Sequence, residues 1–534
     1  MSQKNLAEHH QLNTTSSATT GAGPSTEADV VSKAELTRSP EFIEKMLLYL
    51  ERKNLFRTVS VSIKIGGNNN TLTPARVFLP LRNLLLKYPL LFSFPIGEEP
   101  GLQWKPLLEV RLSEVFHVDD SMEVGFKDPD ADTAMLTSVS KFESHCRRKP
   151  LWHMVYYSKT QWLTFYAAHC FTDGGSILAY LKEFVEALNH EEPAGEFPHE
   201  APGGPCNETP GDLLFSLETD LHLLKHGISP VFFDRIDFKP SFGTRVVIRA
   251  IKLAMQMFPV LVPGLLEKAS KSSFFVDGWP RPFGHRSFYE SDHLITEESP
   301  SNNVTPAFIN LAPGDVDSLV SDCRRHKVKL NTYVVFVYLH TIHEMYPDLY
   351  TKEFLKITIV ASLRNIYTTL SSHNTYLGND GRFDDGFYSF LANYYFDPNT
   401  PYSWDAVKKY HDFLHQTINS AKWINEYYTL GRTMTAETYL DPIVEIRKDD
   451  TFLWITNLGH VEVIDHGDSG KFHIEDILFA PSSGAILGTH HVTMCSTTKS
   501  GLNIGFSDAD PNVKDWAAFG MKLKENLLSF GNKM

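Results

Sequence analysis

Residues 161–189 constrain the fold more than any other stretch, because a strand, a tight turn and a helix follow one another directly. QWLTFYAAH (161–169) is the apolar, aromatic run of a buried strand, and SILAYLKEFVEALN (176–189) has the spacing of an amphipathic helix. The turn between them contains His169 and Asp173, and two glycines follow the aspartate. A helix of this kind buries its apolar face on a sheet, so the sequence predicts an α/β fold.

A second series of helices and strands follows later in the chain, in a similar order. The sequence divides into a first half at residues 38–240, an apolar linker at 241–290 and a second half at 291–534. Because 534 residues exceed what one ordinary core holds, two cores are expected. The predicted architecture is a pseudo-duplicated pair of α/β sandwich halves that face one another, and a ligand is expected in the cleft at their interface.

Two further segments differ from the rest of the chain in composition. Residues 1–37 are rich in Ser, Thr, Ala and Gly and lack hydrophobic periodicity, which predicts a disordered tail. The apolar run at 245–266 is interrupted by Arg249, Lys252 and two prolines. It predicts a buried helix followed by a loop, with a helix at an interface or a cap over a pocket as alternatives.

Charge and cysteine content argue against several classes of function. Lys and Arg number 50 against 64 Asp and Glu, and no basic run stands out, which argues against a nucleic-acid partner. The five cysteines form no CxxC pair, and the pairs His9-His10 and His490-His491 lack a third ligand, so no metal site is expected. The chain shows neither a secretory signal nor an apolar span of about 20 residues, and a cytoplasmic protein is expected.

The residues of the turn have chemistry of their own. A neutral histidine at the end of a strand is able to take a proton from an attacking hydroxyl or amine. Asp173 could orient the imidazole or hold the turn by pairing with an arginine, and we favour the second role. Cys170 should point away from the base if the strand geometry continues, as a buried and inert cysteine. The local pattern alone leaves a catalytic and a structural role for His169 equally open.

Several ordered motifs give the chain a wider resemblance. HxxxDG between a strand and a helix, in a chain with two halves, resembles the CoA-dependent acyltransferase superfamily of chloramphenicol acetyltransferase, the plant BAHD enzymes and condensation domains. More closely, the chain is similar to the fungal alcohol acetyltransferase family. The matching segments are KYPLL (87–91), AHCFTDG (168–174), DRIDFKP (234–240), YLGND (376–380), ITNLG (455–459), IEDILFAPSSGA (474–485) and MCSTTKSGLNI (494–504).

This resemblance implies roles for individual residues. His169 would be the general base that deprotonates the acceptor in a ternary complex. Asp173 would keep the shape of the turn and Gly174 would leave room beside the base. Arg364, in the segment SLRN, would pair with Asp173, and Asn379, in YLGND, would lie near the acyl donor. The plant enzymes' DFGWG segment is absent as such, which makes the fungal family the better template.

The resemblance also implies a reaction and its partners. The chain would transfer acetyl from acetyl-CoA, a co-substrate, to a hydrophobic alcohol, with no bound cofactor. An N-acetyltransferase acting on a long-chain or amphipathic amine is the first alternative, and a non-catalytic lipid or isoprenoid binder is the second. Family members associate peripherally with the endoplasmic reticulum or lipid droplets, partly through terminal helices, and for this chain that association stays open. Acceptor choice depends on pocket shape, which the sequence does not give.

Overall fold

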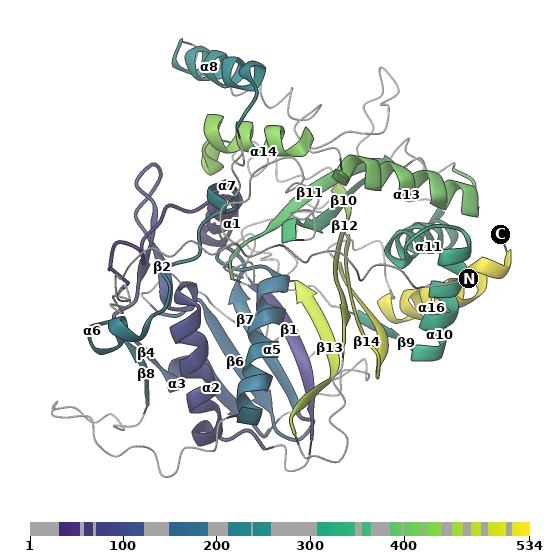
Figure 1. The fold of residues 1–534 in the computed structure, drawn as a ribbon. Helices are drawn as coiled ribbons and strands as arrows, with labels where there is room; N and C mark the ends of the chain where they lie inside the picture. The colour runs from purple at the N-terminus through teal and green to yellow at the C-terminus, as the bar shows by residue number, and fades with distance from the viewer. Residues whose placement is uncertain are drawn as a thin grey trace, which may run out of the picture.

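The computed structural model describes most of residues 31–533. The segments outside the described residues are 1–30, 54–57, 68–70, 122–148, 191–211, 236–238, 258–306, 348–354, 365–384, 397–399, 420–421, 439, 441–450, 463–470, 482–489, 509–514 and 534. Two sheets with helices packed on them form the body of the protein (Figure 1). The α/β architecture with two cores, predicted from the sequence, is confirmed.

The first sheet has the strand order β13-β1-β7-β6-β5. Its strands are β1 (Thr58–Gly66), β5 (Phe116–Asp119), β6 (Trp152–Tyr157), β7 (Trp162–Ala168) and β13 (His473–Pro481). β1 runs antiparallel to both β7 and β13, so β13 forms an edge of the sheet and β7 its central strand. Figure 1 shows α2 (Pro74–Lys87) and α5 (Gly174–His190) over one face of this sheet.

The second sheet has the order β11-β10-β12-β14-β15-β9. Its strands are β9 (Ala307–Leu311), β10 (Leu355–Ser362), β11 (Ser389–Phe396), β12 (Thr451–Val461), β14 (His490–Thr497) and β15 (Gly501–Asp508). Its helices are α10 (Pro313–Arg325), α11 (Leu330–Met345), α13 (Trp404–Asn419), α14 (Lys422–Thr433) and α16 (Trp516–Lys533). In α16, Phe519, Leu523 and Leu527 are fully buried, as the helical spacing of the C-terminal sequence predicts.

The remaining described elements lie outside the two main sheets. They are α1 (Phe42–Arg52), a 3₁₀ turn (Pro89–Phe92), β2 (Ser93–Ile96), β3 (Gln103–Pro106), β4 (Glu109–Arg111), α3 (Leu112–Val115), β8 (Leu213–Ser216), α6 (Leu217–Asp220), a second 3₁₀ turn (Leu221–Leu223), α7 (Phe232–Arg235) and α8 (Phe242–Met257). Among the residues that the structure describes, no helix is both long enough and apolar enough to cross a bilayer.

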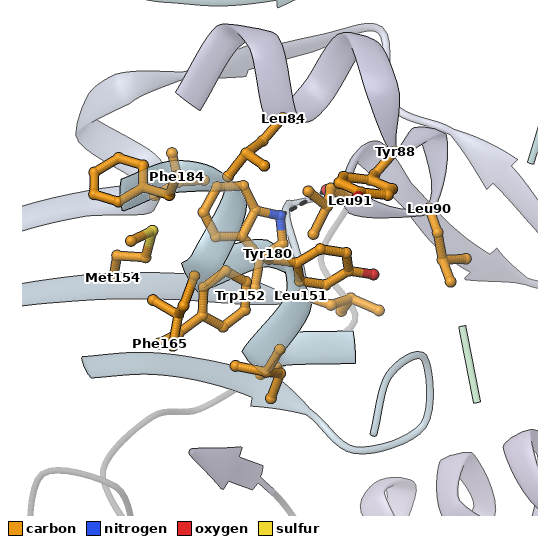
Figure 2. Packing of buried hydrophobic residues seen from close by; sticks show 14 of the residues in the cluster. Leu84, Tyr88, Leu90, Leu91, Leu151, Trp152, Met154, Phe165, Tyr180 and Phe184 are labelled. Carbon is orange, nitrogen blue, oxygen red and sulfur yellow. Dashed lines mark hydrogen bonds between the residues drawn. The ribbon is translucent and has the colours of Figure 1, made fainter. Parts of the chain in front are cut away.

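Trp152 lies at the centre of the first core. Its indole stacks on Phe165 of β7 with ring centroids 5.2 Å apart, and its Nε1 donates a 2.7 Å hydrogen bond to the carbonyl of Leu91 (Figure 2). Leu91 belongs to the turn that follows α2, in the KYPLL segment. The side chain therefore fills apolar space and also satisfies a backbone group that the turn leaves without a helical partner, which fixes α2 and its following turn against β6 and β7.

The two sheets do not correspond exclusively to the two halves of the sequence. β13 comes from the predicted second half, 291–534, yet it pairs with β1 of the first sheet. It also contacts the second sheet, since Thr493 Oγ1 donates to the Phe479 carbonyl at 2.6 Å and Asn503 Nδ2 donates to the Ile477 carbonyl at 2.8 Å. β13 thus joins the two sheets and brings the second half of the chain beside β1 and α5.

The predicted disordered tail at 1–37 extends too far. Leu36 is fully buried in the first core, and the Glu35 carbonyl accepts a 2.9 Å hydrogen bond from the amide of Ile228. Arg38 pairs with Trp104 as an isolated bridge. The polar composition gave no sign of these contacts, because two buried apolar residues, Val31 and Leu36, within a Ser- and Thr-rich stretch produce no periodic pattern.

The buried helix predicted within residues 245–266 is also wrong. α8 covers Phe242–Met257, and most of its described side chains are exposed, including Val246, Val247 and Leu253. The helix packs along α14 at the edge of the molecule rather than inside a core (Figure 1).

Candidate active site

The HxxxDG turn lies between the central strand β7 and helix α5. β7 ends at Ala168, whose amide donates a 2.8 Å hydrogen bond to the Leu151 carbonyl, and His169 is the next residue. Asp173 caps α5, because its Oδ1 accepts a 2.9 Å hydrogen bond from the amide of Ser176. The turn therefore has a fixed start in the sheet and a fixed end at the helix.

His169 is half-buried, and the contacts of its ring define its tautomer. Nδ1 lies 2.8 Å from the carbonyl oxygen of Thr172, which only accepts, so Nδ1 carries the hydrogen and the neutral ring has its lone pair at Nε2. Burial lowers the pKa of His169, and the Thr172 carbonyl and the Asp173 carboxylate oppose this shift without cancelling it. The ring of Phe387, from the second half of the chain, lies 5.5 Å away between centroids. The imidazole is thus neutral at cellular pH.

Asp173 is almost fully buried, and its carboxylate is surrounded by donors. Its Oδ2 accepts hydrogen bonds from Arg364 Nη1 at 2.8 Å, from the Tyr388 amide at 2.9 Å and from Ser389 Oγ at 3.1 Å. Burial alone would raise the pKa of Asp173, but the Arg364 charge and these hydrogen bonds hold it below its ordinary value. The carboxylate is charged and anchors the turn to the second half.

Arg364 follows β10 and reaches the turn with both of its terminal nitrogens. Besides the ion pair with Asp173, Nη2 donates a 2.6 Å hydrogen bond to Ser176 Oγ. The guanidinium lies over the Tyr388 ring, 5.0 Å from its centroid. The structure thus brings Asp173 and Arg364 together across the two halves, and both are more than four-fifths buried at the side chain.

Gly174 and Gly175 lie where neighbouring side chains leave no room for a Cβ atom. A Cβ on Gly174 would come within 2.8 Å of Leu458 and 2.9 Å of Phe479, and a Cβ on Gly175 within 2.9 Å of Arg364 Nη1. The expected room beside the base at Gly174 is therefore filled by side chains of β12 and β13. Gly174 allows the two halves to pack tightly behind the turn.

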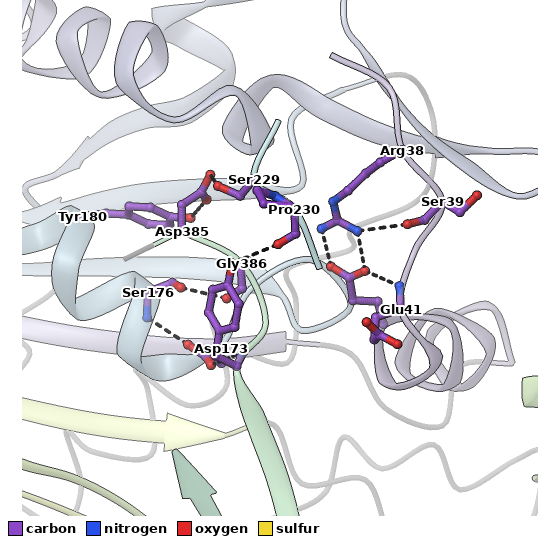
Figure 3. Close-up of polar contacts among 12 residues, drawn as sticks. Arg38, Ser39, Glu41, Asp173, Ser176, Tyr180, Ser229, Pro230, Asp385 and Gly386 are labelled. Atoms are coloured by element: carbon purple, nitrogen blue, oxygen red, sulfur yellow. Dashed lines mark hydrogen bonds and ion pairs between the residues drawn. The ribbon is translucent and has the colours of Figure 1, made fainter. Parts of the chain in front are cut away.

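Asp385 is a buried residue that the sequence analysis did not identify, and its hydrogen bonds stabilise the same region. Asp385 accepts hydrogen bonds from Tyr180 of α5 through Oδ1 and from Ser229 Oγ through Oδ2, the latter at 2.7 Å. Ser176 Oγ donates to the carbonyl of Gly386 at 2.7 Å (Figure 3). The acidic pair and glycine in FDDGFYSF mark a turn before a strand, and that signal could have identified the segment.

The remaining sequence candidates fall into three groups. Cys170 is buried in the first core, as predicted. His490 and His491 are buried in β14, and His490 Nδ1 lies 3.2 Å from Tyr338 Oη. Asn379 lies outside the described residues. Within the part of the chain that the structure describes, no three His, Cys, Asp or Glu side chains gather as a metal site would require.

Solved structures share this fold at low sequence identity. A trichothecene 15-O-acetyltransferase from Fusarium sporotrichioides aligns over 95% of this chain and 100% of its own, with a TM-score of 0.58 and 9% identity. The epimerization domain from the third module of tyrocidine synthetase B covers 93% of this chain and 98% of its own at a TM-score of 0.52 and 11% identity. The condensation domain of the monacolin K polyketide synthase covers 93% and 97%, with a TM-score of 0.52 and 11% identity.

Sequence comparison identifies the family directly. No curated protein matches the chain. The family model described as alcohol acetyltransferase matches residues 117–528, which is more than three-quarters of the chain and includes the HxxxDG turn, Arg364 and β13. The protein is therefore a CoA-dependent acyltransferase, and the chain belongs to the alcohol acetyltransferase family.

Proposed function

We propose that the protein transfers acetyl from acetyl-CoA to the hydroxyl of a hydrophobic alcohol, with His169 as the general base. The observation that carries the proposal is the 2.8 Å contact between His169 Nδ1 and the Thr172 carbonyl. It assigns the basic lone pair to Nε2 and keeps the ring from rotating. Membership of the alcohol acetyltransferase family supports a hydroxyl acceptor.

The reaction is a direct transfer in a ternary complex. As the acceptor oxygen attacks the thioester carbonyl, Nε2 of His169 takes the hydroxyl proton, and a carbon–oxygen bond forms. The tetrahedral intermediate then expels the CoA thiolate, the carbon–sulfur bond breaks, and the proton on Nε2 passes to the sulfur. The lowered pKa of His169 keeps the ring neutral before the attack, so that the base is ready at cellular pH.

Asp173 and Arg364 act as positioning residues in this proposal. The Asp173 carboxylate is engaged by Arg364, Ser389 and backbone amides, and His169 Nδ1 is engaged by Thr172 instead. The pair therefore holds the turn that orients the imidazole and does not relay a proton. The donor-binding role predicted for Asn379 stays a prediction.

The experiment compares two acceptors and two histidine variants. Purified full-length protein receives acetyl-labelled acetyl-CoA with either isoamyl alcohol or a sphingoid-type amine, and the labelled product and released thiol are measured. We expect labelled ester, and a fall in kcat/KM of about 10²–10⁴-fold in His169→Gln. His153→Gln is the matched control, because His153 is also half-buried, lies 3.3 Å from a backbone carbonyl through Nδ1 and has a pKa lowered by burial.

The outcomes separate the alternatives. Labelled amide without ester would contradict the alcohol acceptor and favour N-acetylation. Full activity in His169→Gln would refute the role of the base. Thiol release that depends on the acceptor and on His169 would rule out a non-catalytic lipid binder, while equal losses in the His153 and His169 variants would point to general destabilisation.

A further inference from the structure

Helix α8 has an exposed surface that the acyl-transfer site does not use. It covers Phe242–Met257, packs along α14 and stands at the edge of the molecule, away from both sheets (Figure 1). The HxxxDG turn and its partners include no residue of this helix. Its sequence, FGTRVVIRAIKLAMQM, contains no Asp or Glu, although the chain as a whole carries a formal charge of −14.

The side chains of α8 divide into faces with different surroundings. Thr244, Ile248 and Ile251 are partly buried and share one face at helical spacing. A second face, here called the apolar stripe, is exposed to solvent. It consists of Phe242, Val246, Leu253 and Met257, whose exposed fractions are 76%, 47%, 57% and 61%. At about 100° per residue, these four positions lie within about 60° of one another.

A row of cations borders the apolar stripe. Arg245, Arg249 and Lys252 are exposed and lie together on the side of the helix next to Phe242. An exposed apolar stripe with a parallel basic row is the pattern of a helix that lies in a membrane interface. Because the Debye length is about 8 Å at physiological salt, the row acts on a nearby surface with little opposition from distant acidic groups of the chain.

We propose that α8 docks the protein onto an anionic lipid bilayer, with the apolar stripe at the headgroup and acyl boundary and the basic row on the lipid phosphates. A second copy of the chain is a poorer occupant. A helix of 16 residues is about 24 Å long, so a stripe about 10 Å wide offers roughly 240 Å², against about 800 Å² per partner in a standard interface. Binding to a lipid surface requires no comparable contact area, because apolar burial and the attraction of cations to lipid phosphates act on a single helix.

Vesicle sedimentation of the full-length protein tests this surface. Phosphatidylcholine vesicles with phosphatidylserine should bind the protein, whereas vesicles of phosphatidylcholine alone should bind it weakly, and added salt should release it. The triple variant Arg245→Gln, Arg249→Gln, Lys252→Gln should lose about 100-fold in binding to anionic vesicles. Arg324→Gln with Arg325→Gln, which neutralises two exposed cations of α10, should bind like the wild type.

Variants of the apolar stripe separate lipid docking from other occupants. Val246→Ser with Leu253→Ser should weaken vesicle binding by about tenfold per side chain without lowering the thermal unfolding midpoint. Met521→Ser is the matched control, because Met521 is 69% exposed on α16.

The proposal is overturned if the wild type fails to bind anionic vesicles, or if the stripe and basic-row variants bind as well as the wild type. A fall in the midpoint without vesicles would show that the chain itself covers the stripe, and a dimer in light scattering that these variants dissolve would show a second copy. None of these readouts depends on the proposed acceptor.

Discussion

Removing the Arg364 side chain tests the anchoring of the HxxxDG turn. In Arg364→Ala, the buried Asp173 carboxylate loses its cation and Ser176 Oγ loses a donor. Breaking a buried ion pair from one side costs about 3–5 kcal/mol. The lower end of that range is expected, because the Ser176 and Tyr388 amides and Ser389 Oγ still solvate the carboxylate.

This free energy converts to a measurable shift of the unfolding midpoint. Unfolding entropy is about 2.1 cal/mol/K per residue, or about 1.1 kcal/mol/K for 534 residues that unfold together. A cost of about 3 kcal/mol then lowers the midpoint by about 3 °C, and by more if one half unfolds separately. Differential scanning calorimetry at neutral pH measures the shift, and kcat should fall as well because the turn that holds His169 loses its anchor.

Two further variants make this test specific. Arg364→Lys keeps the charge but not the two-nitrogen fork to Asp173 and Ser176, so an intermediate midpoint is expected. Lys408→Ala removes an exposed ion pair to Asp412 on α13 and should leave the unfolding midpoint close to that of the wild type. A midpoint for Arg364→Ala within about 1 °C of the wild type, with kcat unchanged, would refute the anchoring role.

Three other predictions follow from the geometry of the site and from α1. Gly174→Ala should destabilise the protein by about 1–3 kcal/mol in thermal unfolding, because its Cβ would approach neighbouring side chains within 3.0 Å, whereas Gly314→Ala, which meets nothing within 4 Å, should be nearly neutral. The acidic limb of kcat/KM should lie below about pH 6.5, because burial lowers the pKa of His169, and a limb above that value would contradict a neutral buried base. Burial and the Glu44 carboxylate raise the pKa of Glu41 to about 7, so its contribution to stability is present at acid pH and is lost as the pH rises from about 4.5 through 7. Glu41→Gln should flatten the thermal midpoint across this window, and an unchanged slope would disprove the assignment.

Local patterns predicted the elements well where one periodicity dominates. The apolar run at 161–169 corresponds to β7, and the amphipathic spacing at 176–189 corresponds to α5. The start of α1 depends on a contact of another kind, since the amide of the N-cap residue Glu41 donates a 2.6 Å hydrogen bond to Glu44 Oε2. Helix caps depend on single side-chain contacts, which periodicity does not report.

Local sequence patterns did not predict which distant segments of the chain contact one another. The apolar run of β13 predicts a strand but not its sheet, and only the structure shows that it pairs with β1. The sequence did not identify Asp385 as a residue of this region, because its hydrogen-bond donors are Tyr180 and Ser229, which lie 205 and 156 residues away in the chain. Arg364 could be paired with Asp173 only through the family resemblance, since nothing in the spacing of 191 residues predicts the contact.

The spacing of four positions between His169 and Asp173 serves the geometry of the turn. The Thr172 carbonyl, one residue before the aspartate, contacts His169 Nδ1, while the Asp173 side chain caps α5 by accepting from the Ser176 amide. One short loop therefore fixes the tautomer of His169 with its backbone and binds the second half through its carboxylate. Shortening the loop would break one of these two contacts. Replacing the carboxylate with an amide would keep its size but remove the charge that Arg364 needs, so the motif requires an acid even though that acid does not touch the ring nitrogen Nδ1.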